Sequence, residues 1–135
     1  MILPFDVIST IICDDIRREW NGKDILIGVY GSGIKLSAMP STLVLWIWLE
    51  TRINQVGVIP LRLRITDGND NPIFEQQMLD INVVAMEDAN ISFGGIPVTI
   101  TSPGPMKIYL ASTADWQLIK TINVTHGEIT HSSLR

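Results

Sequence analysis

The hydrophobic pattern is densest over residues 43–53, where both alternating sets of side chains are largely apolar. One set consists of leucines and isoleucines, namely Leu43, Leu45, Ile47, Leu49 and Ile53. The other set begins with Val44, Trp46 and Trp48 and continues with Glu50 and Arg52. Because alternate side chains of a strand lie on opposite sides of its sheet, a single core buries only one set. The second set therefore needs a cover of its own.

Two arrangements satisfy this pattern. In the first, Trp46 and Trp48 fill the core, as a strand tryptophan does in immunoglobulin domains, and a loop such as residues 86–95 covers the leucines. In the second, the tryptophans face outward and mark an interface, because exposed apolar patches are typical of association sites and Trp is enriched in their hot spots. The candidate interface residues are Val44, Trp46, Trp48, Glu50 and Arg52. Self-association is the simplest way to cover them, because a second copy of the same strand would supply the missing apolar layer.

Short β-branched or alternating runs occupy most of the remaining chain. They predict strands over residues 5–16, 23–30, 60–66, 73–84, 91–93, 97–101, 107–111 and 116–125. Asn21-Gly22 predicts a two-residue type I′ turn between the first two of these strands. In that register Asp14 shares a side with Ile12 and Ile25, so Asp14 is either buried with a partner or displaced by a bulge.

Roughly seven to eight short strands, regular turn signals and no convincing amphipathic helix predict an all-β, antiparallel β-sandwich. An immunoglobulin-like arrangement is the preferred one, and jelly-roll and C2-like sandwiches share the same signature. The length of 135 residues fits one domain. We place this domain at residues 1–125 and a polar C-terminal tail at residues 126–135.

Charge and cysteine content narrow the class of partner. The formal net charge of −4 and the lack of a basic cluster beyond Arg17-Arg18 argue against nucleic acid. Cys13 is the only cysteine, which excludes an intrachain disulfide and favours a reducing compartment. Pro4 and Asp6 interrupt the N-terminal apolar stretch, which argues against a signal peptide or membrane span. We therefore expect a cytoplasmic protein with neither nucleic acid nor membrane as its partner.

The opening of the chain resembles an uncharacterised family of small bacterial proteins. The matching motifs are Cys13-Asp14-Asp15-Ile16-Arg17-Arg18-Glu19, Gly22-Lys23 and Leu26-Ile27-Gly28-Val29-Tyr30. Members of that family open with a Cys/Ala-Asp segment, an Arg-x-Glu, a Gly-Lys turn and a Leu-Ile-Gly-Val-Phe/Tyr strand. The resemblance implies a β-sandwich of bacterial or phage origin. It implies no activity, and it transfers no functional residue.

The stretch from Asp67 to Phe74 is similar to the calcium-binding linker of cadherins, in which D-x-N-D-N is followed by Pro and an aromatic residue. Here the spacing is short by one residue, and no L-D-R-E segment accompanies it. The oxygen ligands of a calcium site would come from Asp67, Asn69 and Asp70. Turn chemistry alone explains the same residues, so we assign no metal and no cofactor.

Two further clusters have simple structural explanations. Asp14, Asp15 and Glu19 are explained as the solvated end of a hairpin, since acid/base chemistry needs carboxylates in a pocket and no pattern marks one. The Gly-x-Gly of residues 31–33 opens no helix whose amides would face a phosphate.

These patterns favour a non-enzymatic interaction module that self-associates, or docks on a partner protein such as one encoded in the same operon, through the Trp46/Trp48 strand. The alternative is a β-sandwich domain that binds a small ligand, an anion or calcium through residues 67–71 and 31–33. A hydrolase is less favoured, because the sequence pairs no nucleophile with a base.

Overall fold

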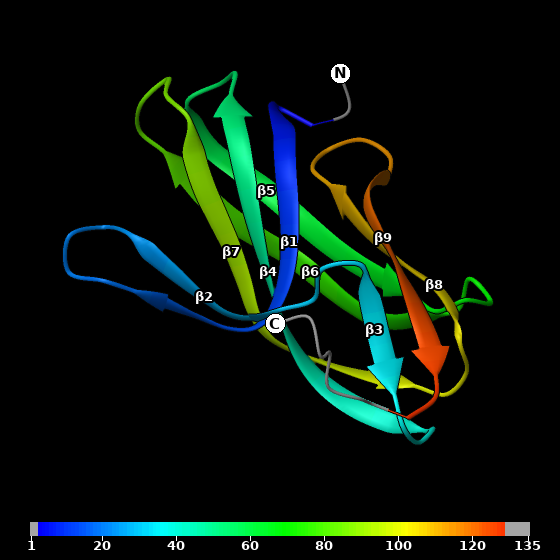
Figure 1. The fold of residues 1–135 in the computed structure, drawn as a ribbon. Coiled ribbons are helices and arrows are strands. Elements are labelled where there is room, and N and C mark those ends of the chain that lie inside the picture. Colours follow the sequence, from blue (N-terminus) through cyan, green and yellow to red (C-terminus); the bar gives the residue numbers. More distant parts are fainter. Residues whose placement is uncertain (1–2, 129–135) are drawn as a thin grey trace.

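The computed structural model describes residues 3–128, apart from the side chains of residues 77 and 78, and is an all-β sandwich (Figure 1). Its nine strands are β1 (Phe5–Arg18), β2 (Asp24–Val29), β3 (Gly33–Leu36), β4 (Ser41–Ile53), β5 (Gly57–Thr66), β6 (Pro72–Val83), β7 (Ala89–Ile100), β8 (Gly104–Ala111) and β9 (Gln117–His126). The predicted sandwich is confirmed, with nine strands instead of seven or eight.

The strands form two sheets. The first sheet has the order β2-β1-β4-β7, and the second has the order β3-β9-β8-β5-β6. All pairings are antiparallel except that of β3 with β9. The central run of the sequence, β4, lies inside the first sheet between β1 and β7. Both of its edges are therefore hydrogen-bonded, and only its two faces remain to be covered.

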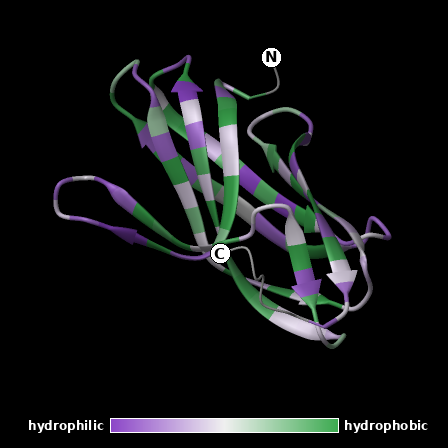
Figure 2. Cartoon of the chain, in the orientation of Figure 1, coloured by the Kyte–Doolittle hydropathy of each residue, from purple (hydrophilic) through white to green (hydrophobic). Residues whose placement is uncertain are grey.

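The leucine set of β4 faces the core. Leu45, Ile47 and Leu49 are each 0% exposed, and the buried side of β5 and β8 in the second sheet completes the same cluster. Alternating apolar and polar bands along the strands reflect this two-layer arrangement (Figure 2). The outer set, which begins with Val44, lies on the opposite side of β4. The arrangement in which the tryptophans of this strand fill the core is therefore wrong.

β1 pairs with two different strands along its length. Its first half, up to Cys13, pairs with β4, whereas Cys13 to Arg18 pairs with β2. The chain bends between the two halves, so that the hairpin of β1 and β2 projects from the sandwich (Figure 1). We call residues 13–29 the hairpin arm.

The turn at the tip of the arm is longer than predicted. The amide of Glu19 donates to the carbonyl of Lys23 at 2.8 Å, and the amide of Gly22 donates to the carbonyl of Glu19 at 3.0 Å. These bonds close a three-residue loop that ends in Gly22, which has a φ of 87°. A type I turn followed by a left-handed residue is a common geometry for such loops. The register therefore shifts by one residue relative to the prediction, and Asp14 is exposed.

Two β-bulges also change the predicted pattern. The short strands expected at residues 91–93 and 97–101 form one strand, β7, whose register shifts opposite Leu45 and Ile47. In β9 a second shift, between the partners of Ile108 and Tyr109, turns Leu118 outward with 47% exposure. A bulge adds one residue to one strand, so every later side chain changes face relative to strict alternation.

The remaining differences lie at the ends of elements. The four residues of β3 were not predicted as a strand, because so short a run shows little alternation. β9 reaches His126, the first residue of the predicted polar tail. Residues 129–135, the rest of that tail, lie outside the described residues.

The two faces of β4 predict different costs of truncation. Leu49→Ala is expected to lower the free energy of unfolding by roughly 2–5 kcal/mol, because it leaves a cavity in the core. Val44→Ala is the control, because Val44 is 55% exposed, and its cost is expected to be below about 1 kcal/mol. Urea unfolding measures both changes. Equal losses would contradict the assignment of the inner and outer faces.

Candidate functional site

The five predicted interface residues share the outer side of the first sheet, but they differ in exposure. Val44 is 55% exposed, and Arg52 is also exposed. Trp46, Trp48 and Glu50 are partly buried. Another part of the same chain therefore covers some of this side, and the question is which part.

Trp46 lies against the backbone of β7 because a glycine faces it. A Cβ atom built on Gly94 would coincide with ring atoms of the Trp46 indole. At the neighbouring Gly95, the added Cβ would meet only Cγ1 of Val44, at an ordinary contact distance of 3.5 Å. Gly94 therefore supplies the space that lets the indole lie flat on the sheet.

Trp48 is tied to the hairpin arm. Its Nε1 donates a hydrogen bond to Oδ2 of Asp24, the first residue of β2, at 3.1 Å. The other oxygen of Asp24, Oδ1, accepts a hydrogen bond from Nε of Arg18 at 3.0 Å. The Asp24 side chain is only 5% exposed. A carboxylate removed from water needs such partners. The guanidinium satisfies it from within the arm, and the indole holds the arm against β4.

The base of the arm buries consecutive residues on opposite sides of β1. Ile12, 1% exposed, belongs to the core, whereas Cys13, 0% exposed, does not. Burial raises the pKa of the Cys13 thiol, and its Sγ donates a weak hydrogen bond to the carbonyl of Asp15 at 3.4 Å. A buried, protonated thiol is a poor nucleophile, which is typical of a structural cysteine.

The predicted acidic cluster lies along the exposed part of the arm. Asp14 accepts a hydrogen bond from the hydroxyl of Tyr30 at 2.8 Å, and Asp15 lies 3.4 Å from Nε of Arg17. Partial burial, with this hydrogen bond and the charge of Asp14, raises the pKa of Tyr30 to about 12. Gly28 makes room for the Asp14 side chain, since a Cβ there would meet the carboxylate. These contacts are those of a solvated hairpin.

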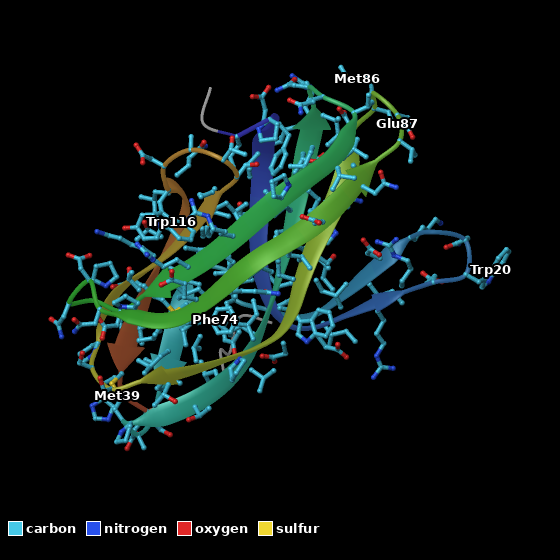
Figure 3. All side chains as sticks on the ribbon, turned by 180° about the vertical axis from the view of Figure 1, so that it is seen from behind. Trp20, Met39, Phe74, Met86, Glu87 and Trp116 are labelled. Atoms are coloured by element: carbon cyan, nitrogen blue, oxygen red, sulfur yellow. The ribbon has the colours of Figure 1, made fainter. Side chains whose placement is uncertain are left out.

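One alternating set of β2 is apolar and open to solvent. Ile25, Ile27 and Val29 are 43%, 40% and 52% exposed, whereas the alternate residue Leu26 is partly buried. Trp20 stands at the tip with 97% exposure (Figure 3). The sequence pattern predicts an ordinary hairpin of the sheet here and does not predict the exposure of this row. The available signal was that β2, like β4, has aliphatic residues in both alternating sets.

An aromatic cluster on the second sheet was also missed. The guanidinium carbons of Arg62 and Arg64 lie 4.7 and 4.4 Å from the ring centroid of Trp116, which is labelled in Figure 3. Arg64 also donates two hydrogen bonds of 3.3 Å to the carboxylate of Glu75. The two arginines alternate along β5 with the buried Leu61, Leu63 and Ile65. Trp116 comes from the loop before β9, so no local pattern links it to them.

The turn proposed for calcium is held together by its own backbone. Oδ1 of Asp67 accepts hydrogen bonds from the amides of Asn69 and Asn71 at 2.9 and 3.0 Å. Nζ of Lys107 lies 3.6 Å from Oδ1 of Asp70, which places a positive charge where a cation would bind. Within residues 3–128, no group of three or more His, Cys, Asp or Glu side chains is placed to hold a metal ion. These contacts favour the turn interpretation.

Comparisons with known proteins add little. No family model matches the chain, and no curated protein matches it. Two solved structures of a beta-glucosidase from Listeria innocua, one of them in complex with glucose, align with 90% of this chain at 11% identity and a TM-score of 0.46. The aligned part is only 16% of the enzyme chain.

No helix in the described part of this chain has the length and hydropathy to cross a membrane.

The contact between Trp46 and Gly94 predicts a position-specific loss of stability. Gly94→Ala is expected to lower the free energy of unfolding by about 1–3 kcal/mol, because the added methyl group displaces the indole ring. Gly95→Ala is the matched control, since its methyl group makes only an ordinary contact. Chemical unfolding of the two variants measures the difference. Equal stability would show that the indole does not lie on Gly94.

Proposed function

We propose that this chain is a non-enzymatic interaction module that associates with itself, or docks on a partner protein, through the outer side of the first sheet. The observation that supports this function is the set of exposed aliphatic residues, which we call the surface, made up of Val44 of β4 and of Ile25, Ile27 and Val29 of the arm, with exposed fractions of 40% to 55%. Groups of exposed apolar residues are typical of association sites.

The two tryptophans have a supporting role in this proposal. Trp48 ties the arm to β4 through Asp24, and Trp46 packs on the neighbouring strand β7 at Gly94. Glu50 and Arg52 provide a polar rim on the same strand, a common feature around an apolar interface. A surface that is already rigid loses little entropy on binding, which favours association.

The strand order also supports an immunoglobulin-like arrangement, which we infer as part of the proposal. β1, β4 and β7 would correspond to strands A, B and E of that fold, and β6, β5, β8 and β9 to strands C′, C, F and G. The hairpin arm would then be an insertion that follows the first strand.

Val44→Lys tests the proposed surface. The charge is expected to dissociate the wild-type assembly and to leave the fold intact, because Val44 is largely exposed. Trp48→Glu is a less specific variant, since it would place a second carboxylate beside Asp24. Sedimentation velocity over a range of concentrations measures the assembly.

Val58→Lys is the matched control, because Val58 is also a strand valine, is 62% exposed and lies in the second sheet. It is expected to sediment like the wild type. Dissociation by both variants alike would contradict the assignment of the surface. A wild-type chain that remains monomeric at high concentration would contradict self-association.

A further inference from the structure

We infer that the arm part of the surface takes a second copy of this chain, and that the two copies pair edge to edge through β2 in an antiparallel, two-fold arrangement. This inference rests on the proposed function and deepens it, because it names the occupant and the pairing. Its starting point is that, among residues 3–128, β2 pairs with β1 on one side only, so no described strand pairs with its other edge.

The other edge strands of the sandwich carry features that oppose strand addition. β7 contains Pro97 and the bulge at Gly94 and Gly95. β6 begins at Pro72 and shifts register twice along β5, and β3 has only four residues. Proline, bulges and short length are the usual ways in which proteins protect a sheet edge.

The edge of β2 has no proline and no bulge over its first four residues, and the whole strand, with six residues, is longer than β3. From Asp24 to Ile27 its sequence has no proline, and its pairing with β1 has no register shift. The regular stretch ends at Gly28, which has a φ of 68°. The one charged side chain in this stretch, that of Asp24, turns toward Trp48 and Arg18 and away from solvent.

The hydrogen bonds at the tip set the register of the proposed pair. Because the amide of Glu19 donates to the carbonyl of Lys23, alternation along an antiparallel pair directs the amides of Ile25 and Ile27 toward β1. The amide of Leu26 then points to the free edge. Pairing Leu26 with Leu26 of the second copy gives a self-complementary contact, as a two-fold axis requires. In this register, Ile25 lies opposite Ile27 of the second copy on the exposed side.

The charges of the arm favour an antiparallel alignment. The base of the arm carries Asp14 and Asp15, whereas residues 17–24 toward the tip carry three cations, Arg17, Arg18 and Lys23, and two carboxylates, Glu19 and Asp24. An antiparallel pair places the tip of one arm beside the base of the other. A tip with a net charge of +1 then lies toward a base with two carboxylates, whereas a parallel pair would bring the two acidic bases together.

A charge exchange within one chain tests this register. Combining Ile25→Lys with Ile27→Lys places lysine opposite lysine at both symmetry-related contacts, and dissociation is expected. Combining Ile25→Lys with Ile27→Glu removes the same apolar side chains but places lysine opposite glutamate twice. Sedimentation is expected to show association at least about tenfold tighter for this second variant. Thermal unfolding verifies that both exposed sites tolerate the changes.

Equal affinity of the two double variants would overturn the edge-to-edge pairing. If Val44→Lys still dissociated the assembly in that case, the proposed surface would stand without this geometry. A monomeric wild type would overturn the inference and leave only docking on a partner protein.

A measurement on the unmodified chain covers the case in which either double variant fails to fold. The amide of Leu26 is expected to exchange with solvent more slowly at concentrations where the chain is assembled than after dilution, because pairing occupies the amide. An exchange rate independent of concentration would overturn the pairing.

Discussion

The hydrogen bond between Nε1 of Trp48 and Asp24 resolves the main constraint of this structure, a central strand that is apolar on both faces. The inner face of β4 is satisfied by the second sheet. The outer face has no third layer of secondary structure in the described residues, and the hairpin arm provides part of the missing cover. The arm in turn depends on Arg18, which shares the carboxylate of Asp24 with the indole.

Several local features follow from this cover. The bend of β1 at Cys13 turns the arm out of the plane of the sheet. Gly94 leaves the space on β7 that the indole of Trp46 occupies. This cover is incomplete. The arm has aliphatic residues in both of its alternating sets, so one side of the arm covers β4 and the aliphatic residues on its opposite side are exposed. The exposed apolar residues that the proposed function requires are therefore a consequence of the hairpin arm that covers β4.

The parts of the fold that depend on strict alternation could be predicted from sequence. The division of β4 into two sets is an example, since it follows from a period of two. Asn21-Gly22 fits a two-residue and a three-residue loop equally well, so the register of the arm could not be predicted. Neither could the bulges of β7 and β9, because a bulge changes the face of a side chain without changing composition. The predicted interface residues lie on β4, whereas most of the exposed aliphatic residues lie on an arm whose departure from the sheet has no periodic signal.

Hydrogen exchange of the indole N–H groups tests most directly whether the arm covers β4. Trp20 is the internal reference, because it is 97% exposed at the tip of the same arm. The N–H of Trp48 is predicted to exchange at least about tenfold more slowly than that of Trp20, since it is hydrogen-bonded to a buried carboxylate. Equal exchange rates for the two indoles would show that the outer face of β4 is uncovered and would contradict this account.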